Sequence, residues 1–331
     1  MNNTLTIVKG NEVNEILKGK EEEIVDLVGK AYIYHNEGKS SLPHSIFLRF
    51  PNRDSDRIIG LPAYIAGDFN LAGMKWISSF PENITHNMER ASAITILNDM
   101  ETGRARAILE GSIISAKRTA GSAALAAKTL HSNKNEKNFG IVGCGRINRE
   151  ILNFIRIVFP SIENVFLIDQ SKERAEEFIR NFQDTSLNFK IQDSVQDVLS
   201  HAKLICFATT AGVPYVNSIE GCDEDSTILN ISLRDFAPEV IANCDNIVDD
   251  LDHVCRENTS IHLTEMKLNT RDFVRGNLAD VLSGKMENRK VGKTVMFSPF
   301  GLGVLDLALA YMVEEEVEKN GMGTVIEDFL L

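Results

Sequence analysis

Residues Asn138–Leu152 read NFGIVGCGRINREIL. The start of this segment predicts a buried strand and its end predicts a helix, with Gly143 and Gly145 of a G-x-G-x-x-G pattern between them. Gly143 permits a tight turn, and Gly145 lets the backbone approach a pyrophosphate at the helix N-terminus. Asn148 takes the third glycine position, where its side chain is expected to widen the helix–sheet contact slightly. An incidental glycine turn is the alternative, but the flanking strand and helix favour dinucleotide binding.

The expected cofactor is NAD, because a second apolar run, NVFLIDQ, ends in Asp169. A carboxylate at the end of the second strand accepts hydrogen bonds from the adenosine ribose hydroxyls and repels a 2′-phosphate. Lys172 and Arg174 follow closely and would soften this preference. The balance of these charges still favours NAD over NADP.

From about Leu125 onward, short apolar runs alternate with helical or turn segments. This alternation predicts an α/β fold with a Rossmann-type doubly wound parallel sheet over residues 126–304. Residues 1–125 instead predict an antiparallel sheet behind a helix near Glu21–Tyr34. Residues 305–331 begin in a strongly helical segment that is expected to pack back on the first domain. The Rossmann domain is therefore predicted to be inserted into an α+β domain.

Composition excludes several classes of function. The net charge is −12 and no Lys/Arg cluster occurs, which argues against nucleic-acid binding. No window reaches the roughly 18 uncharged apolar residues of a membrane helix, so no membrane partner is expected. Five widely spaced cysteines suit reduced thiols and a cytoplasmic location. The histidines lack metal-ligand spacing, so no metal site is predicted.

Four charged residues are candidates for chemistry beside the cofactor. Lys75 lies in the apolar run GMKWISSF, Arg118 lies among small residues at a predicted helix start, and Arg49 is flanked by apolar residues in SIFLRF. For each of these cations the alternative is an ordinary surface position. Asp235 directly follows the predicted strand STILNISL, where loops carry function in this architecture, and its alternative is a helix N-cap.

Three segments carry a resemblance to a known family: GMKWISSFPENITHNMERASAITILND (73–99), SIISAKRTAGSAALAAKTL (112–130) and FSPFGLGVLDLA (297–308). Together with the glycine turn they resemble the ornithine cyclodeaminase/μ-crystallin family over nearly the whole chain. The resemblance implies a substrate-binding and dimerisation domain built from both chain ends, here 1–125 and 305–331, and a Rossmann NAD-binding domain between them. A homodimer is therefore expected.

DRIIGLPAYIAG (56–67), K-W-I-S and N-M-E-R-A-S-x-x-x-I-L-N-D are similar to one branch of this family. That branch contains N-[(2S)-2-amino-2-carboxyethyl]-L-glutamate dehydrogenases, which make L-2,3-diaminopropionate for siderophores and peptide antibiotics. The resemblance implies that Arg49, Lys75 and Arg118 bind carboxylates of an anionic amino-acid conjugate. It also implies that Asp235 handles a proton or a water, and we assign catalysis to Asp235 and Lys75.

Cofactor contacts are expected from both sides of the glycine turn and from the ends of later strands. The residues assigned to NAD are Arg118, Thr119, Gly143, Gly145, Arg146, Ile147, Asp169, Thr209 and Ser232.

Two departures from the family pattern bear on the assignment. Ile59 stands where cyclodeaminases carry a glutamate, which weakens ornithine as a substrate, and Asn148 departs from the usual third position of the turn. Ornithine cyclodeamination, alanine dehydrogenation and cyclic ketimine reduction remain alternative reactions. A non-catalytic binding protein and a metabolite-sensing regulator are alternatives of another class.

Overall fold

The structure is a computed structural model, and it describes residues 3–86, 88–182 and 186–329. The chain divides into two compact units: unit 1 contains Met1–Arg118 and Leu302–Leu331, and unit 2 contains Thr119–Gly301. The boundaries proposed from the sequence lie seven residues later at the first junction and three residues later at the second. Helix α3 (Gly111–Leu130) carries the first junction as one continuous helix.

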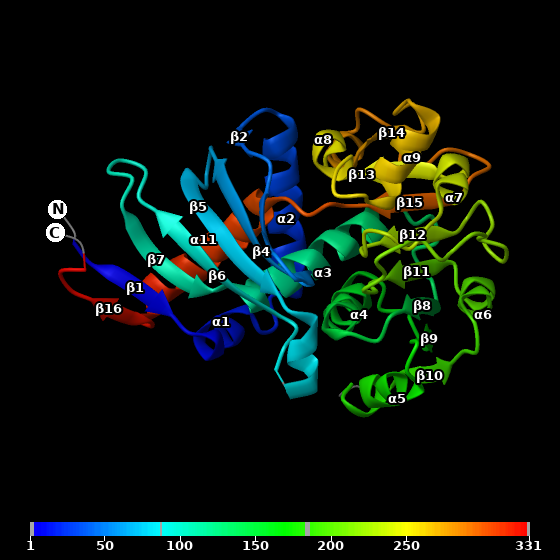
Figure 1. The fold of residues 1–331 in the computed structure, drawn as a ribbon, viewed down its shortest axis with the longest axis horizontal. Coiled ribbons are helices and arrows are strands. Elements are labelled where there is room, and N and C mark those ends of the chain that lie inside the picture. Colours follow the sequence, from blue (N-terminus) through cyan, green and yellow to red (C-terminus); the bar gives the residue numbers. More distant parts are fainter. Residues whose placement is uncertain (1–2, 87, 183–185, 330–331) are drawn as a thin grey trace. The chain divides into compact units, whose positions relative to one another are not determined.

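Unit 1 is built on a sheet with the order β16-β1-β7-β6-β5-β4-β2, to which β3 adds by pairing with β4 (Figure 1). All its pairs are antiparallel except β1 with β7. The strands are β1 (Leu5–Val8), β2 (Ser40–Ser41), β3 (Ile46–Phe50), β4 (Arg53–Ile65), β5 (Leu71–Ser79), β6 (Ala91–Asn98), β7 (Ala105–Glu110) and β16 (Thr324–Ile326). The antiparallel sheet predicted for the N-terminal part is confirmed.

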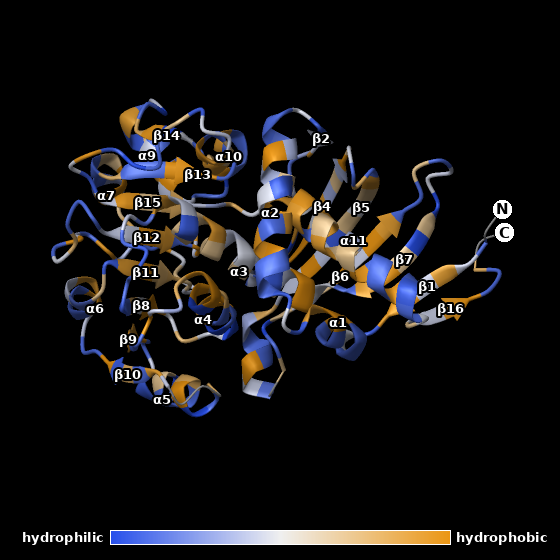
Figure 2. Ribbon diagram, turned by 180° about the vertical axis from the view of Figure 1, so that it is seen from behind, coloured by the Kyte–Doolittle hydropathy of each residue, from blue (hydrophilic) through white to orange (hydrophobic). Residues whose placement is uncertain are grey.

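Helix α11 (Gly303–Asn320) packs on β4, β5 and β6. Figure 1 shows it behind these strands and Figure 2, from the opposite side, shows it in front. Two glycines bring it close to the sheet: a Cβ on Gly73 would lie 3.0 Å from Cδ2 of Leu307, and one on Gly303 would lie 3.2 Å from the carbonyl oxygen of Leu61. Since residues three and four apart share a helix face, Asp306 also points toward β5.

Two further helices of unit 1, α1 (Gly10–Leu17) and α2 (Glu21–Asn36), contact α11. The helix predicted near Glu21–Tyr34 is therefore confirmed, with its C-terminal end two residues later. A 3₁₀ helix, η1 (Pro81–His86), lies in the connection between β5 and β6.

Unit 2 contains a parallel sheet of eight strands in the order β10-β9-β8-β11-β12-β15-β13-β14. The strand order reverses direction between β8 and β11, which is the switch point where ligands bind in doubly wound sheets. The predicted Rossmann-type fold is confirmed. The strands are β8 (Asn138–Val142), β9 (Asn164–Ile168), β10 (Asn188–Ile191), β11 (Leu204–Phe207), β12 (Thr227–Asn230), β13 (Asp245–Val248), β14 (Val274–Asn277) and β15 (Val295–Ser298).

Helices lie on both sides of this sheet, and Figure 1 shows α4 on one side with α6 and α7 on the other. The central strands β11, β12 and β15 are buried throughout, as expected for a covered parallel sheet, and they are largely apolar in Figure 2. The helices are α4 (Arg146–Val158), α5 (Lys172–Arg180), α6 (Val195–His201), α7 (Pro238–Asn243), α8 (Leu251–Val254), α9 (Ser260–Leu268) and α10 (Leu278–Leu282). Among the described residues, no helix is long and apolar enough to cross a membrane.

Candidate active site

Lys75 and Arg118 meet on one carboxylate inside unit 1. Nζ of Lys75 donates to Oδ2 of Asp306 at 2.8 Å, and Nε of Arg118 donates to Oδ1 of the same residue at 3.1 Å. Lys75 is 2% exposed, Arg118 is 8% exposed and Asp306 is fully buried, so none of them has an ordinary surface position. Nζ of Lys75 also donates to Oγ of Ser115 at 3.2 Å. We call Lys75, Arg118 and Asp306 the buried cation cluster.

Burial and the neighbouring charges shift the pKa values of Lys75 and Asp306 in this cluster. Burial lowers the pKa of Lys75 from 10.5 to about 8, the charge of Arg118 adds to the lowering, and Asp306 opposes it. Burial by itself raises the pKa of Asp306, but Arg118 and Lys75 outweigh burial and the net pKa is lowered. Two cations on one carboxylate leave a net positive charge when Lys75 is protonated, which suits binding of an anion.

Arg118 has further hydrogen-bond donors that can bind such an anion. Among the described residues, its hydrogen bonding to protein is made through Nε to Asp306, and the two terminal nitrogens of the guanidinium donate to none of them. A guanidinium fork binds a carboxylate bidentately. Since α11 supplies Asp306, this side chain fixes the guanidinium plane from one edge and leaves the outer edge to a ligand.

Arg49 lies on β3 with its Cα paired with that of Arg57 on β4, and its side chain is exposed. Its guanidinium carbon is 5.4 Å from the centre of the Phe47 ring. Arg49 therefore belongs to another part of the same sheet, a few residues along the strands from Lys75.

The glycine turn of unit 2 has the geometry expected of a dinucleotide site. Gly143 has φ of 92°, and a Cβ there would lie 2.6 Å from the carbonyl oxygen of Ala208, so a side chain is excluded on both grounds. A Cβ on Gly145 would meet only open space. Gly145 precedes the thirteen-residue helix α4, whose first turn contains Arg146 and Ile147. Backbone N–H groups at this helix start can hold a pyrophosphate.

Asp169 ties the turn to β9. Its Oδ2 accepts from the backbone N–H of Cys144 at 2.7 Å, and its Oδ1 accepts from that of Ser171 at 3.0 Å. The carboxylate is thereby held beside the turn, where it can also accept from ribose hydroxyls. The residues present fit NAD.

Asn148 does more than the sequence predicted. It is fully buried, and Nδ2 donates to the carbonyl oxygens of Val142 at 3.0 Å and Gly143 at 2.7 Å. The side chain therefore joins α4 to the end of β8 by hydrogen bonds instead of serving only as a spacer. It fixes the turn from inside the helix.

Asp235 is fully buried at the carboxyl edge of the parallel sheet. Its Oδ1 accepts from Oγ1 of Thr209 at 2.6 Å, and its Oδ2 has no hydrogen-bond partner within the described part of the chain. Helix α7 begins at Pro238 with Ala237 as its N-cap, so Asp235 is not a helix cap. The Oγ of Ser232 is likewise buried without a partner in the described residues. These unsatisfied oxygens lie just beyond β12, where a doubly wound sheet binds its ligands.

Tyr215 lies beside Asp235. Its backbone N–H donates to the carbonyl oxygen of Asp235 at 3.0 Å. Burial raises the pKa of the Tyr215 hydroxyl, and the charge of Asp235 raises it further. Thr119, the remaining residue assigned to NAD, follows Arg118 directly on α3. The contacts of these residues with a cofactor stay predictions.

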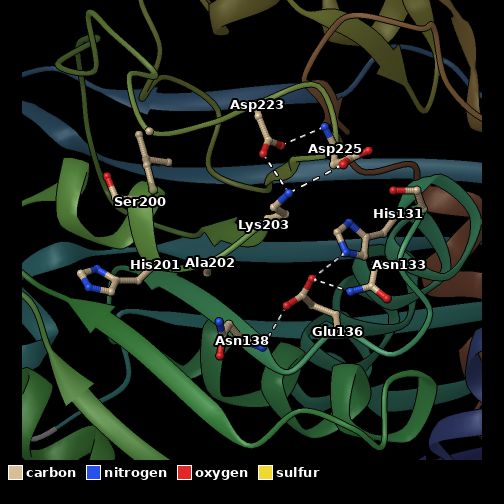
Figure 3. A pocket seen from close by; sticks show the side chains of 13 residues that line it. His131, Asn133, Glu136, Asn138, Ser200, His201, Ala202, Lys203, Asp223 and Asp225 are labelled. Carbon is tan, nitrogen blue, oxygen red and sulfur yellow. Dashed lines mark hydrogen bonds and ion pairs between the residues drawn. The ribbon is translucent and has the colours of Figure 1, made fainter.

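A cavity of about 580 Å³ in unit 2 lies at the opposite edge of the sheet, at the start of β8, β11 and β12. Its charged groups satisfy one another, as Figure 3 shows. Glu136 binds His131 and Asn133, and Lys203 pairs with Asp223 and Asp225. Within the described residues, no group of His, Cys, Asp and Glu is arranged to hold a metal ion. The unsatisfied oxygens of Asp235 and Ser232 lie at the other edge, and we assign the chemistry there.

Sequence reasoning missed Asp306. The available signal was a single carboxylate in the otherwise apolar stretch GVLDLALAYMV of α11. A buried charge almost always has a partner, so this residue pointed to a buried cation elsewhere in the chain.

Known proteins resemble this chain along its full length. The N-((2S)-2-amino-2-carboxyethyl)-L-glutamate dehydrogenase of Staphylococcus aureus (strain NCTC 8325 / PS 47) is 29% identical over 336 residues, covering 98% of this chain and 99% of that protein. The structure of an archaeal alanine dehydrogenase dimer with bound NAD superposes with a TM-score of 0.88 at 25% identity, covering 98% of this chain and 100% of that one.

The fold is also that of Thermococcus litoralis Delta(1)-pyrroline-2-carboxylate reductase, solved with NADH and L-proline. That structure gives a TM-score of 0.89 at 23% identity and covers 96% of this chain and 99% of that one. A sequence model of the ornithine cyclodeaminase/mu-crystallin family matches residues 6–321. Because this match covers nearly every element of both units, the chain belongs to the ornithine cyclodeaminase/mu-crystallin family.

Proposed function

We propose that the protein is an NAD-dependent oxidoreductase that converts N-[(2S)-2-amino-2-carboxyethyl]-L-glutamate and water to L-2,3-diaminopropionate and 2-oxoglutarate. The observation that carries the proposal is the buried cation cluster, because two cations on one buried carboxylate suit a substrate carboxylate. The Staphylococcus aureus relative supports this choice of substrate. Diaminopropionate would then feed the biosynthesis of a siderophore or a peptide antibiotic.

Cationic side chains of unit 1 bind the negatively charged substrate. Arg118 and Lys75 hold the α-carboxylate of the glutamate half, and Asp306 keeps both cations in position. With a pKa of about 8, a fraction of Lys75 is neutral near neutral pH, and this form can take the proton of the substrate's secondary amine while Arg118 keeps hold of the carboxylate. Bound NAD⁺ supplies the acceptor for the hydride that leaves Cα of the glutamate half.

Asp235 handles the hydrolytic step. Loss of hydride and a proton turns the secondary amine into an imine, which water must attack at carbon. Asp235 takes a proton from that water through Oδ2, while Thr209 holds Oδ1. The resulting carbinolamine breaks its C–N bond and releases 2-oxoglutarate and L-2,3-diaminopropionate. The balanced products also include NADH and one proton.

The experiment is an absorbance assay of NADH formation by the purified protein with NAD⁺ and the conjugate, with both amino-acid products identified. L-Ornithine, L-alanine and proline are tested in parallel. The proposal is supported if NADH accumulates with the conjugate and with none of the other three substrates. Ammonia release from ornithine without net NADH, or NADH from alanine or proline only, would replace it with another reaction of the family.

The protein is further proposed to work as a cytoplasmic homodimer. Large apolar side chains lie on the face of the unit 1 sheet opposite Lys75: Ile46 is 65% exposed, Leu48 45%, Trp76 37% and Ile94 41%. Trp76 pairs in register with Gly60 on one side and Ile94 on the other, so these residues are continuous across strands. A second copy of the chain is the occupant we propose, and the dimeric state of the archaeal alanine dehydrogenase supports it.

A further inference from the structure

Two arginines and one serine form a row across three strands of the unit 1 sheet. Arg49 on β3 pairs in register with Arg57 on β4, and Arg57 pairs with Ser79 on β5. Residues directly opposite one another in adjacent strands share a face of the sheet. Lys75 lies four residues before Ser79 on β5, an even number, so it faces the same side. The buried cation cluster and this row therefore share one surface.

A third arginine joins the row from outside the sheet. Arg90 directly precedes β6, and its Nη1 donates to Oγ of Ser79 at 3.1 Å. Ser79 is 6% exposed, so the guanidinium of Arg90 lies over a buried hydroxyl. Burial lowers the pKa of Arg90, and the charge of Arg57 lowers it in the same direction. Arg57 is the residue opposite Ser79 on β4, so Arg57 and Arg90 approach the same position of the sheet.

Arg90 is the arginine of this row that can take a further partner. In the described part of the chain, no carboxylate forms an ion pair with Arg90, whose side chain bonds the neutral Ser79. A ligand carboxylate at this place would use the free edge of the Arg90 fork.

The surface between the two cationic places is apolar. Ile77 on β5 and Ile59 on β4 are paired in register and lie midway between Lys75 and Ser79. Four residues of strand span about 13 Å between Cα atoms, and the long side chains at both ends shorten the gap. The surface is therefore cationic at both ends and apolar in the middle. A ligand with a carboxylate at each end and a methylene chain between them matches this arrangement.

We propose that Arg57 and Arg90, with Arg49 beside them, bind the side-chain carboxylate of the glutamate half while the buried cation cluster binds its α-carboxylate. This inference rests on the proposed function and names the residues that select a dicarboxylic amino-acid unit. Alanine, proline and ornithine carry an α-carboxylate but no second carboxylate. The arginine row therefore discriminates against them as substrates.

The test measures binding to the NADH-loaded protein by calorimetry. The two probes are 2-oxoglutarate and 2-oxopentanoate, which differ in the second carboxylate. We expect the wild type to bind 2-oxoglutarate about 10- to 100-fold more tightly, as a charge-assisted hydrogen-bonded pair predicts. Arg90→Gln and Arg57→Gln should each remove most of this preference, and Arg90→Lys should keep part of it because the charge remains.

Arg53→Gln is the matched control. Arg53 lies in the same hairpin, but its guanidinium packs over the Phe80 ring and its Nε pairs with Asp56 at 3.4 Å. Its removal should leave the preference unchanged. Equal binding of the two probes by the wild type, or a full preference in both Arg57 and Arg90 variants, would overturn the inference.

Turnover separates this inference from the proposed function. If the wild type does not form NADH from the conjugate yet loses its dicarboxylate preference in Arg90→Gln, the proposed reaction is wrong and the subsite stands. If the wild type turns over the conjugate and Arg90→Gln leaves its KM unchanged, the reaction stands and the subsite is wrong. Should Arg90→Gln fail to fold, Arg57→Gln and Arg90→Lys decide the same question.

Discussion

Nζ of Lys75 and Oδ2 of Asp306 lie 2.8 Å apart in the fold although 231 positions separate the two residues in the chain. The pair joins β5 to α11, the helix that the C-terminal segment contributes to unit 1. Both side chains are buried, so each needs the other to remain charged without a large desolvation cost.

Asp306→Asn should destabilise the protein, because two buried cations lose their counterion. We expect the free energy of unfolding to fall by about 3 to 5 kcal/mol, the usual cost of breaking a buried pair. Chemical denaturation measures the change. Glu316→Gln, which removes a carboxylate on the same helix that pairs with Lys20 at 3.6 Å, should leave the free energy of unfolding nearly unchanged, because exposed ion pairs contribute little. Equal effects in both variants would contradict the role given to Asp306.

Substrate binding should weaken above about pH 8, since the pKa of Lys75 is lowered to about 8 and only its charged form attracts a carboxylate. The Kd of 2-oxoglutarate from the NADH-loaded protein, measured by calorimetry from pH 6 to pH 10, should rise beyond that point. Lys75→Arg should remove the rise, because guanidinium stays charged throughout the range. A Kd that rises equally in this variant would assign the titration to another group.

The same pKa shift predicts how stability depends on pH. The folded protein releases the Lys75 proton near pH 8 while the unfolded chain holds it up to about 10.5. Between these values the unfolded state binds more protons, so the contribution of Lys75 to the free energy of unfolding increases as pH rises. Lys75→Met should flatten this increase in denaturant titrations at pH 8, 9 and 10.

Asp235→Asn should lower kcat by about 10²- to 10⁴-fold, the usual contribution of one general base, with a modest change in KM. The amide cannot accept the proton of the attacking water, whereas Thr209 can still donate to its oxygen. Steady-state assays measure both constants. Asp252→Asn removes an exposed carboxylate of unit 2 that pairs with Arg271, and it should leave kcat unchanged. Near-normal turnover by Asp235→Asn would rule out this general base.

Asp169→Ser should shift cofactor choice toward NADP by about tenfold or more in the ratio of kcat/KM values, because the carboxylate no longer repels a 2′-phosphate. The cost is a weaker link to the turn, since Oδ2 of Asp169 accepts from the N–H of Cys144. Melting temperature distinguishes that loss from a change in selectivity. An unaltered ratio would show that Asp169 serves the turn alone.

Trp76→Arg should give a monomer, because a charge would enter the apolar face that we propose lies between two copies. Sedimentation velocity measures the mass in solution. Val291→Arg is the control for adding a charge, since Val291 is 91% exposed on unit 2. A dimeric Trp76→Arg protein would place the interface elsewhere.

Local patterns in the sequence were enough for most of the fold. The glycine turn, the alternation of apolar runs and the long helix before Asn320 were all predicted, and the structure contains β8, α4, β9 and α11 at those places. Short strands such as β10 and β14 were missed, because four residues with little apolar character give no periodic signal. These segments become strands because they form backbone hydrogen bonds to the neighbouring strands β9 and β13.

The sequence by itself determined the elements and the cofactor turn, since periodicity, a glycine pattern and a carboxylate at the end of a strand can each be recognised from a short stretch of chain. Only the tertiary structure decided which charges meet. It brought Asp306 to Lys75 and Arg118, and strand register together with the approach of Arg90 to Ser79 gathered three arginines at one place. Such contacts depend on how distant segments pack and pair, and that information resides in the whole core and not in any local stretch of chain.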